Sequence, residues 1–70
     1  MMPLVYANAG EEHIIVRVGG APAVKKHLED LGFAPGASVT IINQMGGNLI
    51  VNVKESRIAI SREMAQKIMV

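Results

Sequence analysis

The side chains that could hold a metal ion gather mainly in one short stretch of the sequence. Glu11, Glu12 and His13 are consecutive, and the second histidine of the chain is His27. Carboxylate oxygens and imidazole nitrogens are ligands that Fe(II) and Zn(II) accept. Adjacent residues of a strand point to opposite faces, however, so Glu12 and His13 would diverge if both lie in a strand. These four residues are therefore a candidate metal site. The alternative interpretation is a solvated turn and an exposed histidine on a helix.

A second group of residues could bind a protein partner. Lys25, Lys26 and His27 form a short basic run, and Met45 precedes a glycine pair. A basic face can steer association with an acidic surface, and an exposed methionine adapts to an apolar one. The alternative is ordinary solvated charge, because an acidic residue follows each lysine at helical spacing.

Groups that would carry out catalysis are missing. The glycine pair before the expected helix lacks the Gly-Lys-Ser/Thr end of a phosphate-binding loop, and no nucleophile elbow occurs. No serine stands in a pattern with histidine and acid that would activate it. Cysteine is absent, which excludes disulfides and thiolate metal sites. The sequence therefore predicts a protein that is not an enzyme.

The charge and the apolar content exclude further classes. The 70 residues carry 7 Lys and Arg against 6 Asp and Glu, and Tyr6 and Phe33 are the only aromatic residues. A nucleic-acid binder needs a basic groove and stacking aromatics, so no nucleic-acid partner is expected. The apolar runs are far shorter than the ~20 residues of a membrane span, and no signal peptide is recognisable. We expect one soluble domain over residues 1–70 in the cytoplasm, without membrane insertion.

The framework that positions these residues is predicted to consist of short strands. In residues 13–18, alternation predicts a half-buried strand with Ile14, Val16 and Val18 on one face, and Ile15 and Arg17 on the other. A glycine-bearing loop over 44–48 joins the next two strands. The other expected strands span 39–43, 49–53, 57–60 and 67–70.

Helices are expected over 23–31 and, after the N-cap Ser61, over 62–66. The clearest local signal follows the first helix. Gly32 fits a left-handed helix end, Phe33 can fold back on the apolar stripe, and Pro35-Gly36 fits the centre of a type II turn. Short strands, tight turns and one or two short helices predict a mainly β fold, a small and strongly bent barrel.

Two segments carry a resemblance to a known family. They are LEDLGFAPG over 28–36 and SRIAI over 56–60. With IIVRVGG before them and GGNLIVNV between them, their order resembles the ferrous iron transport protein A family (FeoA) over residues 2–70. The resemblance implies an SH3-like barrel with helical insertions. Gly32, Phe33, Pro35 and Gly36 are then a structural motif of that fold and not a binding site.

The resemblance also implies a partner and no catalytic residues. Family members are associated with the membrane ferrous iron transporter FeoB, which has a cytoplasmic GTP-binding part. The implied function is a cytoplasmic accessory protein that binds this part and modulates ferrous iron uptake. The alternative is a stand-alone metal-responsive barrel, similar to the C-terminal domain of iron-dependent repressors, that binds a divalent transition metal such as Fe or Zn. Many members carry Arg where this chain has His27. The oligomeric state stays open, and a weak homo-oligomer is compatible with the sequence.

Overall fold

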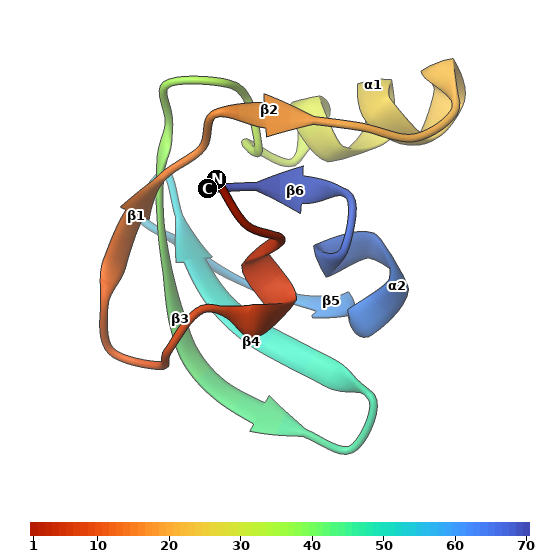
Figure 1. The fold of residues 1–70 in the computed structure, drawn as a ribbon. Helices are drawn as coiled ribbons and strands as arrows, with labels where there is room; N and C mark the ends of the chain where they lie inside the picture. The colour runs from red at the N-terminus through yellow and green to blue at the C-terminus, as the bar shows by residue number, and fades with distance from the viewer.

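Two antiparallel sheets form the framework of the computed structural model, which describes all residues from 1 to 70 (Figure 1). In chain order the elements are the 3-10 helix η1 (Leu4–Tyr6), β1 (Glu12–Ile14), β2 (Arg17–Val18), α1 (Pro22–Asp30), β3 (Ser38–Met45), β4 (Asn48–Val53), β5 (Ser56–Ser61), α2 (Arg62–Ala65) and β6 (Ile68–Met69). The larger sheet has the order β1-β3-β4-β5, and β2 pairs with β6 in the smaller one. The fold is therefore mainly β with two short α-helices, as predicted.

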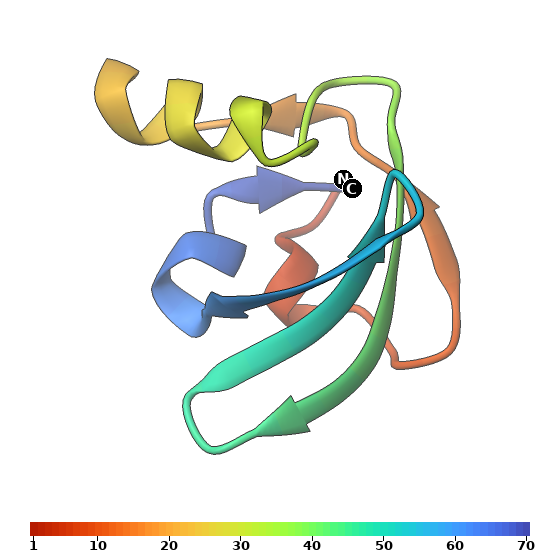
Figure 2. The same cartoon turned by 180° about the vertical axis from the view of Figure 1, so that it is seen from behind.

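The two ends of the chain lie side by side next to β6 (Figures 1 and 2). The N–H of Met2 donates to the carbonyl of Val70 at 2.8 Å, and the N–H of Val70 donates to the carbonyl of Met2 at 2.8 Å. On its other edge, β6 pairs with β2, where Arg17 lies opposite Met69. The last strand is thus paired on both sides, which leaves it no free edge.

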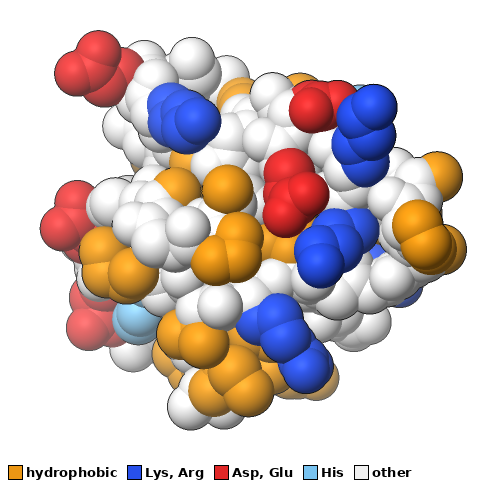
Figure 3. All heavy atoms as spheres, turned by 90° about the horizontal axis from the view of Figure 1, so that it is seen from above, with side chains coloured by type: hydrophobic (Ala, Val, Ile, Leu, Met, Phe, Trp, Pro, Cys, Tyr) orange, Lys and Arg blue, Asp and Glu red, His pale blue; other side chains and the backbone are white.

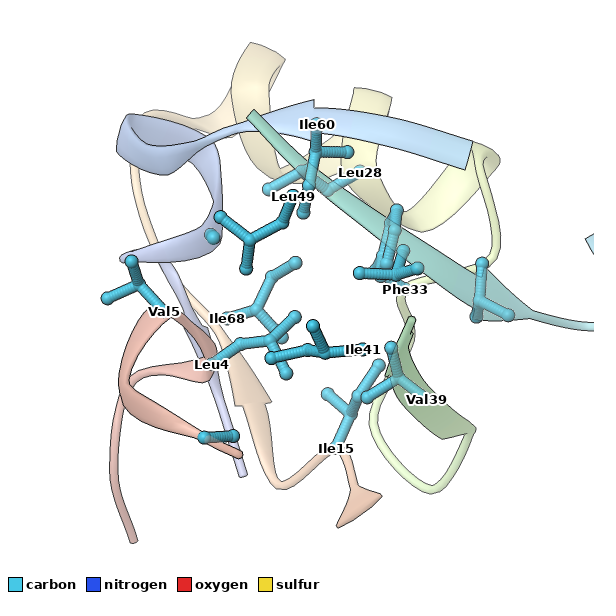
Figure 4. Packing of buried hydrophobic residues seen from close by; sticks show 14 of the residues in the cluster. Leu4, Val5, Ile15, Leu28, Phe33, Val39, Ile41, Leu49, Ile60 and Ile68 are labelled. Carbon is cyan, nitrogen blue, oxygen red and sulfur yellow. The ribbon is translucent and has the colours of Figure 1, made fainter. Parts of the chain in front are cut away.

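One cluster of 15 buried hydrophobic residues forms the core, and no polar or charged residue is buried. Figure 4 shows how Leu4, Leu28, Phe33 and Ile68 converge from four different segments. Leu4 belongs to η1, an element that the sequence prediction lacks. The inward residues predicted for the second and third strands are all buried, which confirms their alternation: Val39, Ile41, Leu49, Val51 and Val53.

The predicted strand over 13–18 is wrong in its extent and in its faces. The segment forms the separate strands β1 and β2. Val18 is buried, but Ile14 and Val16, predicted on the same face, are 55% and 56% exposed, whereas Ile15 is buried. The N–H of Ile15 donates to a carbonyl just before β3, and the N–H of Val16 donates to a carbonyl of β6. The chain passes from one sheet to the other here, so a single alternation cannot hold.

The link between β3 and β4 is shorter than the loop predicted over 44–48. Met45 pairs with Asn48, which leaves Gly46-Gly47 as a two-residue turn. Gly46 has a φ of 59°, the positive value that a type II′ hairpin turn requires at its first central position. The hairpin protrudes from the rest of the molecule (Figure 2).

The corner after α1 is confirmed by main-chain hydrogen bonds. Gly32 has a φ of 114°, and the N–H of Phe33 donates to the carbonyl of Leu28 at 2.9 Å, which turns Phe33 into the core. Gly36 has a φ of 90°, and the next N–H donates to the carbonyl of Ala34 at 3.0 Å. This bond and the positive φ are those of a type II turn.

Both predicted helices form, and α1 begins and ends one residue earlier than predicted. α1 begins at Pro22 and packs an apolar stripe on the core. α2 is capped by Ser61, whose Oγ accepts from the N–H of Met64 at 3.1 Å, and it ends at Ala65, one residue before the predicted end. Neither helix has the length and the apolar surface that crossing a bilayer would need.

The turn between β4 and β5 holds two ordinary residues in the left-handed region. Lys54 and Glu55 have φ values of 50° and 62°. Positive φ at both central positions defines a type I′ turn, for which Asn-Gly is preferred because a bulky side chain strains it. The stem of Lys54 covers Gly32, with Cδ 3.3 Å from the position of an added β-carbon. This contact joins the turn to the corner after α1.

We predict that Gly36→Ala lowers the free energy of unfolding by about 1–2 kcal/mol, because alanine must take the left-handed conformation. Gly47→Ala is the matched control: both positions have open space for a β-carbon, but Gly47 lacks a positive φ. Urea unfolding measures both. Equal effects of the two substitutions would contradict the type II turn.

Glu55→Gly is expected to raise the free energy of unfolding by about 0.5–1 kcal/mol, because glycine relieves the left-handed strain. Lys54→Gly should gain less, since it also removes the stem that packs over Gly32. Thermal and urea unfolding of the two variants compare them directly. A destabilised Glu55→Gly protein would mean that its side chain makes a stabilising contact.

Candidate functional site

The acidic and histidine residues near β1 diverge as the strand geometry requires. Glu11 and Glu12 are exposed, whereas His13 is half-buried. His13 lies opposite Val39, a core residue, so its ring is on the inner face of the sheet. The Nε2 atom of His13 is buried and has no hydrogen-bond partner.

The predicted metal ligands do not form one site. His27 is exposed on α1, an element apart from β1 (Figure 1). Nowhere do three or more histidine or acidic side chains come together in a group that could hold a metal ion. The set of Glu11, Glu12, His13 and His27 therefore does not fit a metal as a unit, and no metal-dependent step is derived from it.

The predicted partner-binding residues lie at two separate places. Lys25, Lys26 and His27 are exposed on α1, at one end of the molecule. Met45 is 63% exposed at the tip of the β3–β4 hairpin, at the opposite end (Figures 1 and 2). The four residues cannot contact a partner as one patch, and each group remains a separate prediction.

Charges of both signs are mixed on the surface near α1. In the view of Figure 3, basic side chains lie mainly on the right half among acidic and hydrophobic ones, and further acidic side chains lie along the left edge. Such a surface offers no strong field of one sign to a partner.

Several apolar side chains near the ends of the chain are exposed, which the sequence did not predict. Tyr6, Ile14 and Val16 are 66%, 55% and 56% exposed, and Met2 is 36% exposed. Val16 and Met2 are bonded to the C-terminal segment from its two sides. We call Met2, Ile14 and Val16 the terminal apolar surface. The three consecutive apolar residues at 14–16 were the available signal, since no strand can bury all of them on one face.

Comparison with known proteins gives a consistent result. The FeoA domain family model matches residues 2–70. A relative from Methanocaldococcus jannaschii, described as "Putative Fe(2+) transport protein A", is 36% identical over 70 residues, which cover 100% of this chain and 85% of the relative. A crystal structure of an iron uptake regulatory protein (FeoA) has a TM-score of 0.90 at 27% identity, covering 99% of this chain and 93% of that one.

More distant structures share the fold. FeoA of Stenotrophomonas maltophilia complexed with zinc, described as a prokaryotic SH3 domain protein, has a TM-score of 0.87 at 24% identity, covering 100% of this chain and 89% of that one. A manganese-dependent transcriptional repressor has a TM-score of 0.84 at 14% identity, covering 94% of this chain but 38% of the repressor. At these identities the likeness concerns the fold alone.

The predicted SH3-like barrel is thereby confirmed, and so is the predicted family. The family model spans nearly every residue, and the archaeal relative matches along the full chain. This chain belongs to the FeoA family of ferrous iron transport proteins.

Proposed function

We propose that the chain is a non-enzymatic, cytoplasmic accessory protein of ferrous iron uptake that binds the cytoplasmic part of FeoB and modulates the transporter. Membership of the FeoA family supports the link to iron transport. The absence of any recognisable catalytic motif in the sequence fits a binding role.

The observation that carries the proposal is the terminal apolar surface. Ile14 and Val16 are more than half exposed, whereas 15 other hydrophobic residues are buried in the core. Their main chain is held in place by hydrogen bonds of the two sheets, so the side chains are presented by rigid segments. Exposed apolar side chains on neighbouring segments can mark a protein interface.

The basic run on α1 has a different role in this proposal. Lys25 and Lys26 are exposed, and a rim charge of this kind changes the rate of association more than the affinity. The terminal apolar surface supplies the affinity, and the lysines steer the encounter.

Replacing Ile14 and Val16 together by threonine should weaken binding to the isolated cytoplasmic domain of FeoB about tenfold or more, because apolar contacts at the centre of an interface dominate affinity. Threonine keeps the β-branched shape that strands favour. Amide NMR titration of the labelled protein, with and without guanine nucleotide, maps the surface and gives the affinity.

Ile42→Thr serves as the matched control, since Ile42 is also β-branched and 37% exposed but lies in β3. It should bind FeoB normally. If the unmodified protein shows no shifts at high micromolar FeoB domain, the proposed function is wrong. If shifts cluster on α1 or at Met45, the partner is right and the face is wrong.

The alternative function is a metal-responsive regulatory barrel that binds Fe(II) or Zn(II). The buried Nε2 of His13, which lacks a partner, is the observation that favours it. A histidine nitrogen of this kind can be satisfied by a metal or by a water.

The alternative predicts saturable Fe(II) or Zn(II) binding that is lost when both His13 and His27 are replaced by alanine. Our leading proposal expects the same double variant to bind the FeoB domain with unchanged affinity. Isothermal calorimetry with each metal and with FeoB separates the two. Loss of metal binding together with loss of FeoB binding would join the two functions and contradict our proposal as stated.

A further inference from the structure

The structure has one hollow, and it lies on the outside of the four-stranded sheet. Its volume is about 480 Å³, within the ~300–1,000 Å³ of small-ligand sites and large enough for one long side chain. Two of its eight lining residues, Ala37 and Val53, are hydrophobic. The polar residues that line it are Glu12, Ser38, Thr40, Asn52, Lys54 and Glu55.

Cross-strand register explains how distant residues meet in this hollow. Glu12 lies opposite Thr40, and Thr40 lies opposite Asn52. Directly opposed residues share one face of a sheet, and neighbouring strands are ~4.8 Å apart. A carboxylate, a hydroxyl and an amide therefore form a row about 10 Å long across β1, β3 and β4. Arg57 lies opposite Asn52 and ends the row with a cation at β5, whereas Glu12 forms the acidic end at β1.

The polar groups of the hollow are free to bind a ligand. The side-chain hydrogen bonds in the structure join Gln44 to Asn43 and Met64 to Ser61, and neither involves a lining residue. The carboxylates of Glu12 and Glu55 thus offer acceptors that no protein group occupies.

The one cation of the lining, Lys54, packs its aliphatic stem against the corner after α1. The stem of Lys54 lies over Gly32, with Cγ and Cδ 3.4 and 3.3 Å from the position of an added β-carbon. Gly32 follows the C-terminus of α1, and the negative end of a helix dipole favours a cation there. The strained type I′ turn holds both residues, and Glu55 lines the hollow together with Lys54.

We propose that this hollow binds an arginine side chain of a protein partner. The inference rests on the proposed role as a binding module and adds a second contact to it. A guanidinium group presents five N–H donors in a planar fork, and carboxylates, hydroxyls and an amide oxygen accept such donors. Its aliphatic stem can lie along Ala37, whereas Val53, the other hydrophobic residue of the lining, is buried in the core.

Other ligand classes fit the hollow less well. An anion would meet the two carboxylates of Glu12 and Glu55 against the single ammonium group of Lys54, and an apolar ligand would desolvate six polar side chains. A metal ion would find no group of three acidic or histidine ligands. A lysine ammonium carries the right charge but cannot make the bidentate contact.

The test uses the labelled full chain and the peptide acetyl-Gly-Arg-Gly-amide, without FeoB. Amide shifts of Ser38, Thr40, Asn52 and Lys54 should saturate together. The same peptide with citrulline in place of arginine keeps the shape without the charge, and it should bind at least tenfold more weakly. The lysine peptide should fall between the two, and added salt should weaken the arginine peptide.

The protein variants provide the second comparison. Glu12→Gln with Glu55→Gln should weaken the arginine peptide at least tenfold. Glu11→Gln with Glu63→Gln changes the net charge equally at exposed sites outside the lining, and it should leave binding unchanged. If both double variants lose binding equally, general charge attraction explains it and the site is wrong.

Absence of shifts at the highest soluble peptide concentration, or equal binding of the citrulline peptide, would also overturn the site. Either result leaves the FeoB proposal standing, because no FeoB is present in the experiment. If the glutamine variant at positions 12 and 55 does not fold, the citrulline comparison decides alone.

Discussion

The fold depends on the double pairing of its last strand. β6 has two residues, yet it bonds to β2 on one edge and to the N-terminal residues on the other. These bonds hold Leu4, Val18 and Ile68 over the open side of the four-stranded sheet, where they complete a core without any buried polar residue. A domain of this size has little stability in reserve, so the hydrophobic cluster requires that closure.

Features set by neighbouring residues could be predicted from the sequence. The corner over 32–36 was predictable because Gly32 and Gly36 have conformations that glycine adopts most easily, and Phe33 needs only the preceding helix turn as its partner. The Ser61 cap is equally local. In contrast, residues 13–18 divide between two sheets whose other strands are more than twenty positions away in the chain, and no local alternation encodes that division.

In the candidate sites, too, features set by neighbouring residues could be predicted, whereas features set by distant strands could not. Exposure of the lysines on α1 and of Met45 could be anticipated, but their separation to opposite ends depends on the assembled barrel. The polar hollow was invisible in the sequence, because Glu12, Thr40 and Asn52 meet only through the register of three strands. The inward turn of His13 likewise depends on its pairing with Val39.

The adjacency of Met2 and Val70 has a topological consequence. Because the ends are hydrogen-bonded to each other, a short linker could join them without disturbing any strand. New ends could then be opened between Gly46 and Gly47, in the exposed hairpin tip, where an added β-carbon would meet no atom within 4 Å. Such a circular permutant would keep the barrel while making β6 an internal segment. The order in which this chain is connected is therefore separable from the shape it adopts.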